Sequence, residues 1–143
     1  MMLDLYFSLQ IINYYQYTQN INPVLNFVLV KNTGAAFSIL ENCKLFLISF
    51  AFISIALILF YIVKYIEKLS LFFIFWSSLI IAGIGCNLYE RVYYGYVRDF
   101  FKLNFVNFPI FNISDIFINI GVCAILIIII SNRCTVKNHE NNH

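Results

Sequence analysis

Charged residues are scarce in this 143-residue chain. Asp, Glu, Lys and Arg make up only 11% of the residues, and 62% are hydrophobic, whereas soluble domains have about 25% charged residues. The net charge of +2 argues against a nucleic-acid-binding protein that works through a basic face. Too few polar side chains remain to cover a soluble enzyme, and the high hydrophobic content excludes a disordered chain. The composition therefore indicates a membrane protein.

The sequence also lacks the spacings that mark metal sites and disulfide frameworks. The four cysteines form no CxxC pair, and three of them lie in or beside apolar runs, where cysteine is a small packing residue. The two histidines in the tail NHENNH have no other donor nearby. We therefore predict no metal site and no cofactor. Since no internal repeat or domain boundary is present either, we expect residues 1–143 to form one integral-membrane domain.

Long uncharged runs locate the segments that cross the membrane. Residues 45–63, 69–89 and 116–132 carry no charge, and each run is long enough to cross, or nearly cross, a bilayer core of about 30 Å as a helix. Residues 3–17 are apolar but shorter, and polar residues interrupt them. We interpret them as the outer part of a first helix that is truncated, and residues 133–143 as a frayed polar tail. The predicted fold is an all-α polytopic protein, a four-helix transmembrane bundle with a small β element.

Lys and Arg are divided almost equally between the two sets of connections, so the positive-inside rule does not orient the chain. The connection from about residue 20 to residue 44 contains the strand-like run VLNFVLV, followed by KNTGAAF. Asn-Thr-Gly is a turn signal, because Gly34 tolerates conformations that other residues avoid. The simplest interpretation is a hairpin followed by the start of a helix. The alternative is that the small residues after the turn let a ligand or another backbone approach closely.

The connection from residue 87 to residue 115 concentrates charge beside apolar helices. It carries six charged residues among many aromatics, and charges near a membrane cost free energy unless they pair or face water. Asp99 follows the third predicted helix and Asp115 opens the last one. Because these helices run antiparallel, both carboxylates return to the same membrane face.

Two adjacent carboxylates share a proton, as in aspartic proteases, where one takes a proton from water and the other protonates the carbonyl oxygen. The alternative makes Asp99 an ion-pair partner of Arg98 or Lys102, and Asp115 the N-cap of the last helix. Spacing alone slightly favours this structural alternative.

Three blocks of the sequence, KNTGAAFS, CNLYERVYYGYVRDF and FNISD, resemble the motif series of bacterial lipoprotein signal peptidase (signal peptidase II). The blocks have that family's order and similar spacing, and the resemblance covers roughly residues 3–130. It implies that Asp99 and Asp115 are the catalytic aspartates. It also implies substrate-binding or dyad-supporting roles for a second set of residues, Asn32, Gly34, Asn87, Arg91 and Asn112.

The resemblance further implies a bacterial inner (cytoplasmic) membrane enzyme that spans the membrane four times. Both termini would be cytoplasmic, and the active site, with its small extracytoplasmic β element, would lie near the outer leaflet. The implied substrate is a prolipoprotein whose lipobox cysteine carries diacylglycerol, cleaved before that cysteine. Membrane lipids and the inhibitor globomycin are the other implied partners, and nothing in the sequence demands a dimer.

The chain departs from the family's pattern at Cys86, where glycine is usual, at Glu90, where aspartate is usual, and at Ser8, where lysine is usual. We expect Glu90→Asp to have little effect or to raise activity slightly. Two other functions stay open at this point. One is an inactive relative of the family, and the other is a small proton- or cation-coupled membrane transporter.

Overall fold

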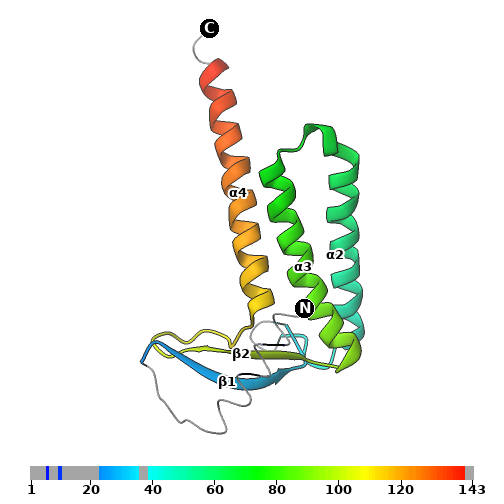
Figure 1. Ribbon diagram of the computed structural model, residues 1–143, viewed down its shortest axis with the longest axis vertical. Helices are drawn as coiled ribbons and strands as arrows, with labels where there is room; N and C mark the ends of the chain where they lie inside the picture. The colour runs from blue at the N-terminus through cyan, green and yellow to red at the C-terminus, as the bar shows by residue number, and fades with distance from the viewer. Residues whose placement is uncertain (1–5, 7–9, 11–22, 36–38, 141–143) are drawn as a thin grey trace.

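The computed structural model describes Tyr6, Gln10, residues 23–35 and residues 39–140, with side chains described as far as Ser131. In this part of the chain, three long helices stand side by side and a two-stranded sheet lies across one end of them (Figure 1). The predicted first helix, 3–17, lies outside the described residues apart from Tyr6 and Gln10. The prediction of a helical membrane fold with a small sheet is confirmed, whereas four helices are not seen in the described part.

The helices are α2 (Lys44–Tyr65), α3 (Leu71–Tyr93) and α4 (Ile113–Glu140), and a short 3₁₀ turn, η2 (Ile66–Lys68), joins the first two. By length and composition, three segments can cross a membrane: Lys44–Lys68, Leu71–Tyr93 and Ile113–Ser131. Large hydrophobic side chains cover their outer faces, with Leu71 83% exposed and Phe72 73% exposed. In water such exposure would be unfavourable, and it is what a lipid-facing surface requires.

Helix bounds differ from the sequence prediction where polar residues take part in helix ends. α3 continues past residue 89 to Tyr93, and α4 begins at Ile113 rather than at 116, because Asn112 and Asp115 form its first turn. The backbone of α4 also continues to Glu140, into the segment predicted as a frayed tail. The added turns of α3 and α4 bring polar residues into the helices at the end next to the sheet.

Two glycines let α3 and α4 pack closely. A Cβ atom at Gly83 would lie 2.5 Å from the main-chain oxygen of Ser114, and one at Gly121 would lie 2.6 Å from the Ile80 side chain. Small residues at such crossings allow helix backbones to approach in a membrane, where no hydrophobic effect drives helices together. The contact at Gly83 fixes the start of α4 against α3, one turn from Asn87.

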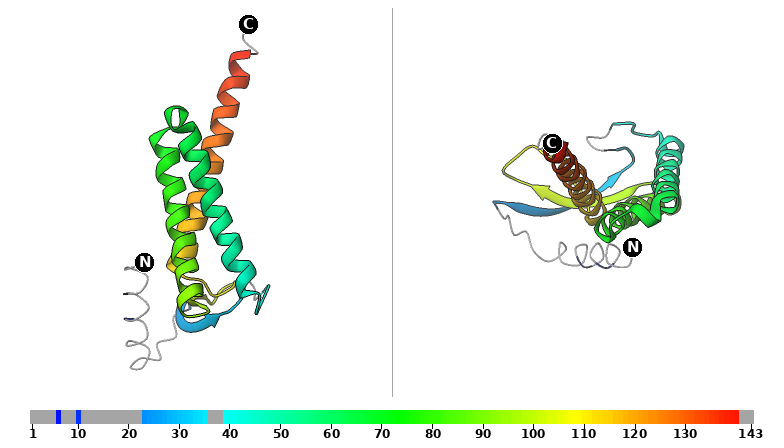
Figure 2. Two further views of the ribbon diagram at one scale, coloured as in Figure 1. Left: turned by 90° about the vertical axis from the view of Figure 1, so that its right-hand side faces the viewer. Right: turned by 90° about the horizontal axis from the view of Figure 1, so that it is seen from above.

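The sheet pairs β1 (Leu25–Asn32) with β2 (Val97–Leu103) in antiparallel fashion. Val30 faces Asp99 and Asn32 faces Val97, and the register shifts between Phe27 and Val30. The strands are far apart in sequence, so the local hairpin that we expected at KNTG is wrong. Seen from above, the sheet reaches beyond the helices (Figure 2).

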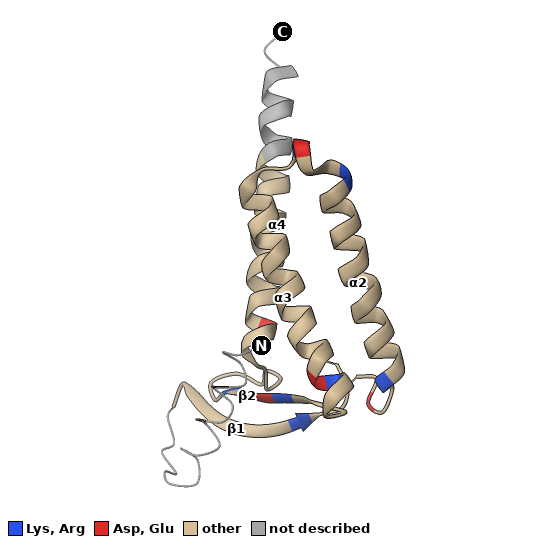
Figure 3. Cartoon of the chain, turned by 45° about the vertical axis from the view of Figure 1, so that its right-hand side comes forward, with Lys and Arg blue, Asp and Glu red and all other residues tan. Residues whose placement is uncertain are grey.

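Most of the best-buried described residues lie where the sheet meets the helices, and Ser77 in the middle of α3 is the exception, at 1% exposed. Phe100 and Asn112 are fully buried, and Val97 and Ser114 are 2% and 1% exposed. Described charged residues gather at the two ends of the helices, whose middle stretches carry none (Figure 3). The core of this protein is therefore built around a polar cluster at one end.

Candidate active site

Asp99 lies in the middle of β2 and is only 3% exposed. Both of its carboxylate oxygens accept hydrogen bonds from side-chain amides. The Nδ2 of Asn32 donates to Oδ2 at 2.8 Å, and the Nδ2 of Asn112 donates to Oδ1 at 2.8 Å. Two amides from different parts of the chain therefore fix the orientation of this carboxyl group.

Asp115 is the third residue of α4 and forms a reciprocal capping box with Asn112. The main-chain N–H of Asp115 donates to Asn112 Oδ1 at 2.9 Å, and the main-chain N–H of Asn112 donates to Asp115 Oδ2 at 3.1 Å. The other oxygen, Oδ1, accepts from Asn87 Nδ2 at 2.8 Å. The helix cap and a bond from α3 thus hold the Asp115 carboxylate.

Asn112 connects the two carboxylates. Its side-chain amide donates to Asp99 and also to Asn87 Oδ1, at 3.1 Å, while its main-chain N–H donates to Asp115. Asn112 is fully buried. One residue therefore sets the position of both aspartates, which places the predicted pair in a single polar cluster.

Gly34 and Arg91 tie the connection after β1 to this cluster. Asn32 Oδ1 accepts from the main-chain N–H of Gly34 at 2.9 Å, and Arg91 Nη2 donates to the carbonyl of Gly34 at 2.8 Å. Arg91 Nη1 also reaches the carbonyl of Asn87, at 3.5 Å. The structure thus brings together all seven residues that the sequence predicted, from β1, α3, β2 and α4.

The structural alternatives for the two aspartates are not what the structure shows. The charged partner of Arg98 is Glu90, whose carboxylate accepts from both the guanidinium and the main-chain N–H of Arg98. Asp99 is held by the amides of Asn32 and Asn112, and no ion pair is recorded for it among the described residues. Asp115 stands three residues after the N-cap, which is Asn112.

The Glu90–Arg98 pair has a structural role that the sequence did not reveal. Glu90 is 4% exposed. Its two carboxylate oxygens accept hydrogen bonds from Arg98, the residue directly before Asp99: one from the main-chain N–H at 2.8 Å and one from the side-chain Nε at 2.9 Å. The guanidinium of Arg98 also lies 4.9 Å from the centre of the Tyr94 ring. Glu90 thereby joins the end of α3 to β2.

Burial changes the acidity of Asp99. Removal from water is the main reason why the pKa of Asp99 rises from 3.8 to about 7. The hydrogen bonds from Asn32 and Asn112 and the charge of Arg91 lower this pKa, whereas the nearby Asp115 carboxylate raises it. Near neutral pH this carboxyl group therefore binds a proton in a substantial fraction of molecules. A group of this kind can donate a proton to a substrate oxygen.

A cavity of about 260 Å³ opens beside the two aspartates. Five of the seven predicted residues border it, and the other two, Gly34 and Asn112, form hydrogen bonds with residues of its wall. Ala35, one of the small residues after the turn, also borders the cavity, as the alternative interpretation of KNTGAAF allowed. Sequence reasoning missed the rest of the wall, which comes mainly from the segment before α4: Val97, Phe108, Pro109, Ile110, Phe111 and Asn119. Most of these are ordinary apolar residues, and only their position beside FNISD could have indicated them.

The donor set does not resemble a metal centre. Among the described residues, no group of three His, Cys, Asp or Glu side chains could hold a metal ion. What the site offers is a pair of carboxyl groups, amides that orient them, and a cavity bordered by both polar and apolar residues. This arrangement suits acid–base chemistry on a bound water and a carbonyl group.

Known proteins are similar to this chain in sequence. The lipoprotein signal peptidase of Streptococcus thermophilus is 39% identical over 114 residues, which cover 80% of this chain and 74% of that protein. The lipoprotein signal peptidase of Enterococcus faecalis is 32% identical over 136 residues, covering 95% of this chain and 84% of that protein. Both alignments span most of each protein.

Solved structures agree with this comparison. A bacterial membrane enzyme determined by the in meso method at 2.3 Å resolution matches with a TM-score of 0.72 and 31% identity, covering 87% of this chain and 81% of that one. A second, at 1.9 Å resolution, matches with a TM-score of 0.65 and 27% identity. The family model described as Signal peptidase (SPase) II matches residues 1–131, so the chain belongs to the signal peptidase II family of membrane-bound aspartic peptidases.

Proposed function

We propose that this protein removes the signal peptide from prolipoproteins by cleaving the peptide bond before the diacylglyceryl-modified cysteine. The observation that carries the proposal is the junction of β2 and α4, where Asn112 donates to both Asp99 and Asp115. Family membership and the lipoprotein signal peptidases of other bacteria support the same substrate class.

In the proposed mechanism, Asp115 accepts a proton from a water molecule while the water oxygen attacks the scissile carbonyl carbon. Asp99, protonated near neutral pH because burial raises its pKa, donates its proton to the carbonyl oxygen. The tetrahedral intermediate then collapses and the C–N bond breaks. The leaving amine takes the proton from Asp115, and Asp99 recovers its own from the intermediate, so both groups return to their starting states.

The other five residues hold this arrangement, and two of them also contact the substrate. Asn32, Asn87 and Asn112 orient carboxyl groups without adding charge, since an amide supplies both donors and acceptors. Arg91 is a permanently charged donor that holds the carbonyl of Gly34. We propose that Arg91 and Asn32, which border the cavity, also contact the substrate backbone.

The proposed setting is the bacterial cytoplasmic membrane, with the sheet end of the molecule at the outer leaflet. There the signal peptide and the acyl chains reach the cavity sideways from the lipid. We further propose that the segment 3–17 forms a fourth helix and that the chain is one integral-membrane domain that acts as a monomer. Globomycin should inhibit it by binding between the two aspartates.

The test is cleavage of a diacylglyceryl-modified lipoprotein precursor by the purified protein in lipid or detergent. Asp99→Asn and Asp115→Asn should each lower kcat by about a hundredfold to ten-thousandfold, the contribution usual for general acid–base groups. Glu67→Gln is the matched control, because Glu67 lies in η2 between α2 and α3, and it should cleave normally. Near-normal turnover by either aspartate variant would contradict the assignment of the pair.

The same assay separates the two other functions. An inactive relative would leave the precursor uncleaved, although the protein is folded. A proton- or cation-coupled transporter needs ionisable groups along a path across the membrane, whereas the described acids lie only at the ends of the helices (Figure 3). Coupled flux into protein-containing liposomes would support that alternative, and its absence is expected.

A further inference from the structure

A second cavity, of about 170 Å³, adjoins the proposed active site. Four residues border both cavities, Asn32, Asp99, Pro109 and Ile110, so Asp99 stands where the two meet. The rest of the second wall comes from β1 and the connection after it: Val30, Lys31, Thr33 and Glu41.

The two cavities have different surroundings. Residues of the membrane-spanning helices α3 and α4 border the first, among them Asn87 and Asp115. No residue of α2, α3 or α4 borders the second, and three of the four residues found only in its wall are charged or polar: Lys31, Thr33 and Glu41. The second cavity therefore lies toward the sheet and away from the lipid-facing helices.

A peptide cleaved at Asp99 must continue on both sides of the scissile bond. On one side is the apolar signal peptide, which fits the cavity bordered by helices. On the other side, the polar chain after the cysteine must leave toward water. We propose that the second cavity binds the first residues after the lipid-modified cysteine in an extended conformation, an inference that rests on the proposed function.

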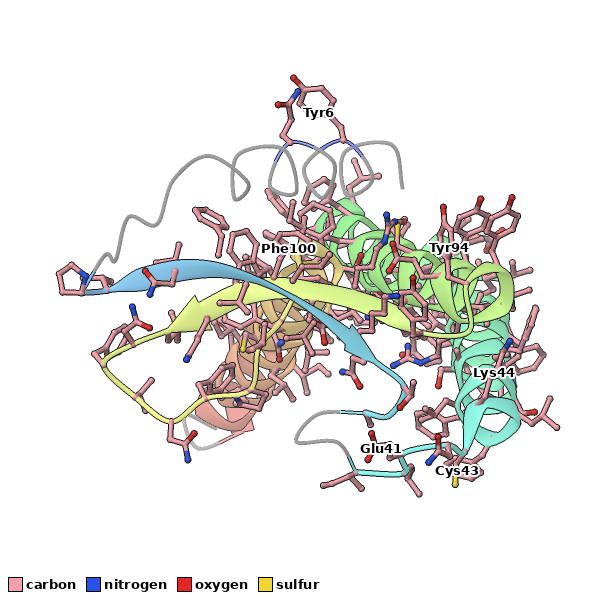
Figure 4. The ribbon with its side chains drawn as sticks, turned by 90° about the horizontal axis from the view of Figure 1, so that it is seen from below. Tyr6, Glu41, Cys43, Lys44, Tyr94 and Phe100 are labelled. Atoms are coloured by element: carbon pink, nitrogen blue, oxygen red, sulfur yellow. The ribbon has the colours of Figure 1, made fainter. Side chains whose placement is uncertain are left out.

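Glu41 is the charge that an incoming side chain meets in this cavity. It is exposed in the connection between β1 and α2 (Figure 4), and the hydroxyl of Thr33 lies 3.4 Å from its Oε1. Lys31 also borders the cavity, but its ammonium lies over the ring of Tyr96, 5.0 Å from the ring centre, and Tyr96 does not border the cavity. The cavity therefore disfavours an acidic residue after the cysteine.

The experiment compares three lipid-modified precursors that differ only in the residue directly after the cysteine, which is Glu, Ser or Lys. We expect kcat/KM for the Lys substrate to exceed that for the Glu substrate by about threefold to tenfold, as for a partly solvated charge pair. Glu41→Gln should bring this ratio close to one, and Glu41→Lys should reverse it. Glu67→Gln, a neutralised acid at the other end of the helices, should keep the wild-type ratio.

The outcomes separate the two proposals. If the wild-type protein cleaves none of the three precursors, the proposed function fails, and this inference fails with it. If it cleaves all three with equal kcat/KM, the function stands and the second cavity does not bind this part of the substrate. If the wild type prefers the Lys substrate and Glu41→Lys keeps that preference, a different surface interacts with the substrate charge, and the assignment to this cavity is overturned.

Discussion

At the residue scale, the site depends on neutral amides rather than on charges. Asn112 donates to both aspartates, and Asn32 and Asn87 each hold one. A lysine or arginine in these places would attract both carboxylates and keep both ionised. Amides fix the geometry and still allow one carboxyl group to stay protonated, which an acid–base pair requires.

The raised pKa of Asp99 predicts how activity changes with pH. Since the pKa is about 7, kcat/KM should fall as the pH rises through 7 and Asp99 loses its proton. In Asn32→Ala, the ionised form loses a hydrogen bond, so the alkaline limb should move up by about half to one pH unit. Measuring kcat/KM against pH checks this.

Asn119→Ala is the control for that measurement, because the Asn119 amide donates to the main-chain oxygen of Asp115 rather than to a carboxylate. The alkaline limb of the pH profile of this variant should stay where it is in the wild type.

The pH dependence of folding stability gives a second measurement of the raised pKa of Asp99. Because folding raises the pKa from 3.8, the folded state takes up a proton, and this group's contribution to stability is lost as the pH rises from about 4 to 7.

The Glu90–Arg98 pair reverses one expectation drawn from the sequence. Glu90 is buried and binds the main chain and side chain of Arg98 together, and an aspartate there would be one methylene too short to keep both contacts. We now expect Glu90→Asp to lower the thermal unfolding temperature in detergent. Breaking a buried pair on one side costs about 3–5 kcal/mol, so Glu90→Gln should be at least as harmful.

The double variant Glu90→Leu/Arg98→Leu is the matching control, because it removes both charges and leaves none buried alone. It should recover part of the stability that Glu90→Gln loses. If Glu90→Asp were as stable and active as the wild type, the pair would not hold β2 against α3.

At the scale of elements, close contact between α3 and α4 positions the proposed catalytic pair. We predict that Gly83→Ala lowers kcat/KM and stability, since its Cβ would lie 2.5 Å from the main-chain oxygen of Ser114 and would push Asp115 away from Asn87. Such overpacking costs about 1–3 kcal/mol. Kinetics and thermal unfolding of the same preparation measure both effects.

Gly85 provides the matched control in the same helix. Among the described residues, no atom outside the local backbone of α3 lies within 4 Å of a Cβ built there, so Gly85→Ala should be neutral or should stabilise α3 by up to about 1 kcal/mol, the helix preference of alanine over glycine. Equal losses in the two variants would show that helix spacing at Gly83 does not matter.

The sequence allowed the apolar helices to be predicted, because uncharged runs are a local signal. The seven residues that the structure gathers in one cluster were named through motifs that resemble a known family, since spacing alone favoured a structural role for the two aspartates. The sequence did not predict that β1 pairs with β2, since strands about 70 residues apart leave no local trace of their register. The extra turns at the start of α4 and the end of α3 were also missed. Both are stabilised by polar contacts, such as the Asn112–Asp115 cap, which hydrophobic patterns do not report.

At the scale of the whole molecule, the sheet and the η2 turn lie at opposite ends of the helices (Figure 1). If the sheet end faces outward, as we propose, a membrane-impermeant thiol reagent added to intact cells should label Cys43, which is exposed at the start of α2. The measurement uses a variant whose other three cysteines are replaced by alanine. Adding Glu67→Cys and removing Cys43 gives the control, which should react only after the cells are opened.

Labelling of the Glu67→Cys protein in intact cells, with Cys43 protected, would invert the proposed orientation. The experiment is independent of catalysis, because neither position borders the cavity beside the aspartates. It therefore tests the localisation even for a protein that cleaves nothing.

The capping box at Asn112 has a consequence for how this enzyme can change over evolutionary time. Asp115 forms one half of the capping box at the start of α4 as well as serving the proposed chemistry, whereas Asp99 is a buried acid that folding must protonate or desolvate. A lineage that no longer needed the activity could replace Asp99 by a neutral residue and gain stability. Replacing Asp115 would remove one of the two bonds of the capping box and weaken the start of α4, so gene decay should erase the two aspartates in that order.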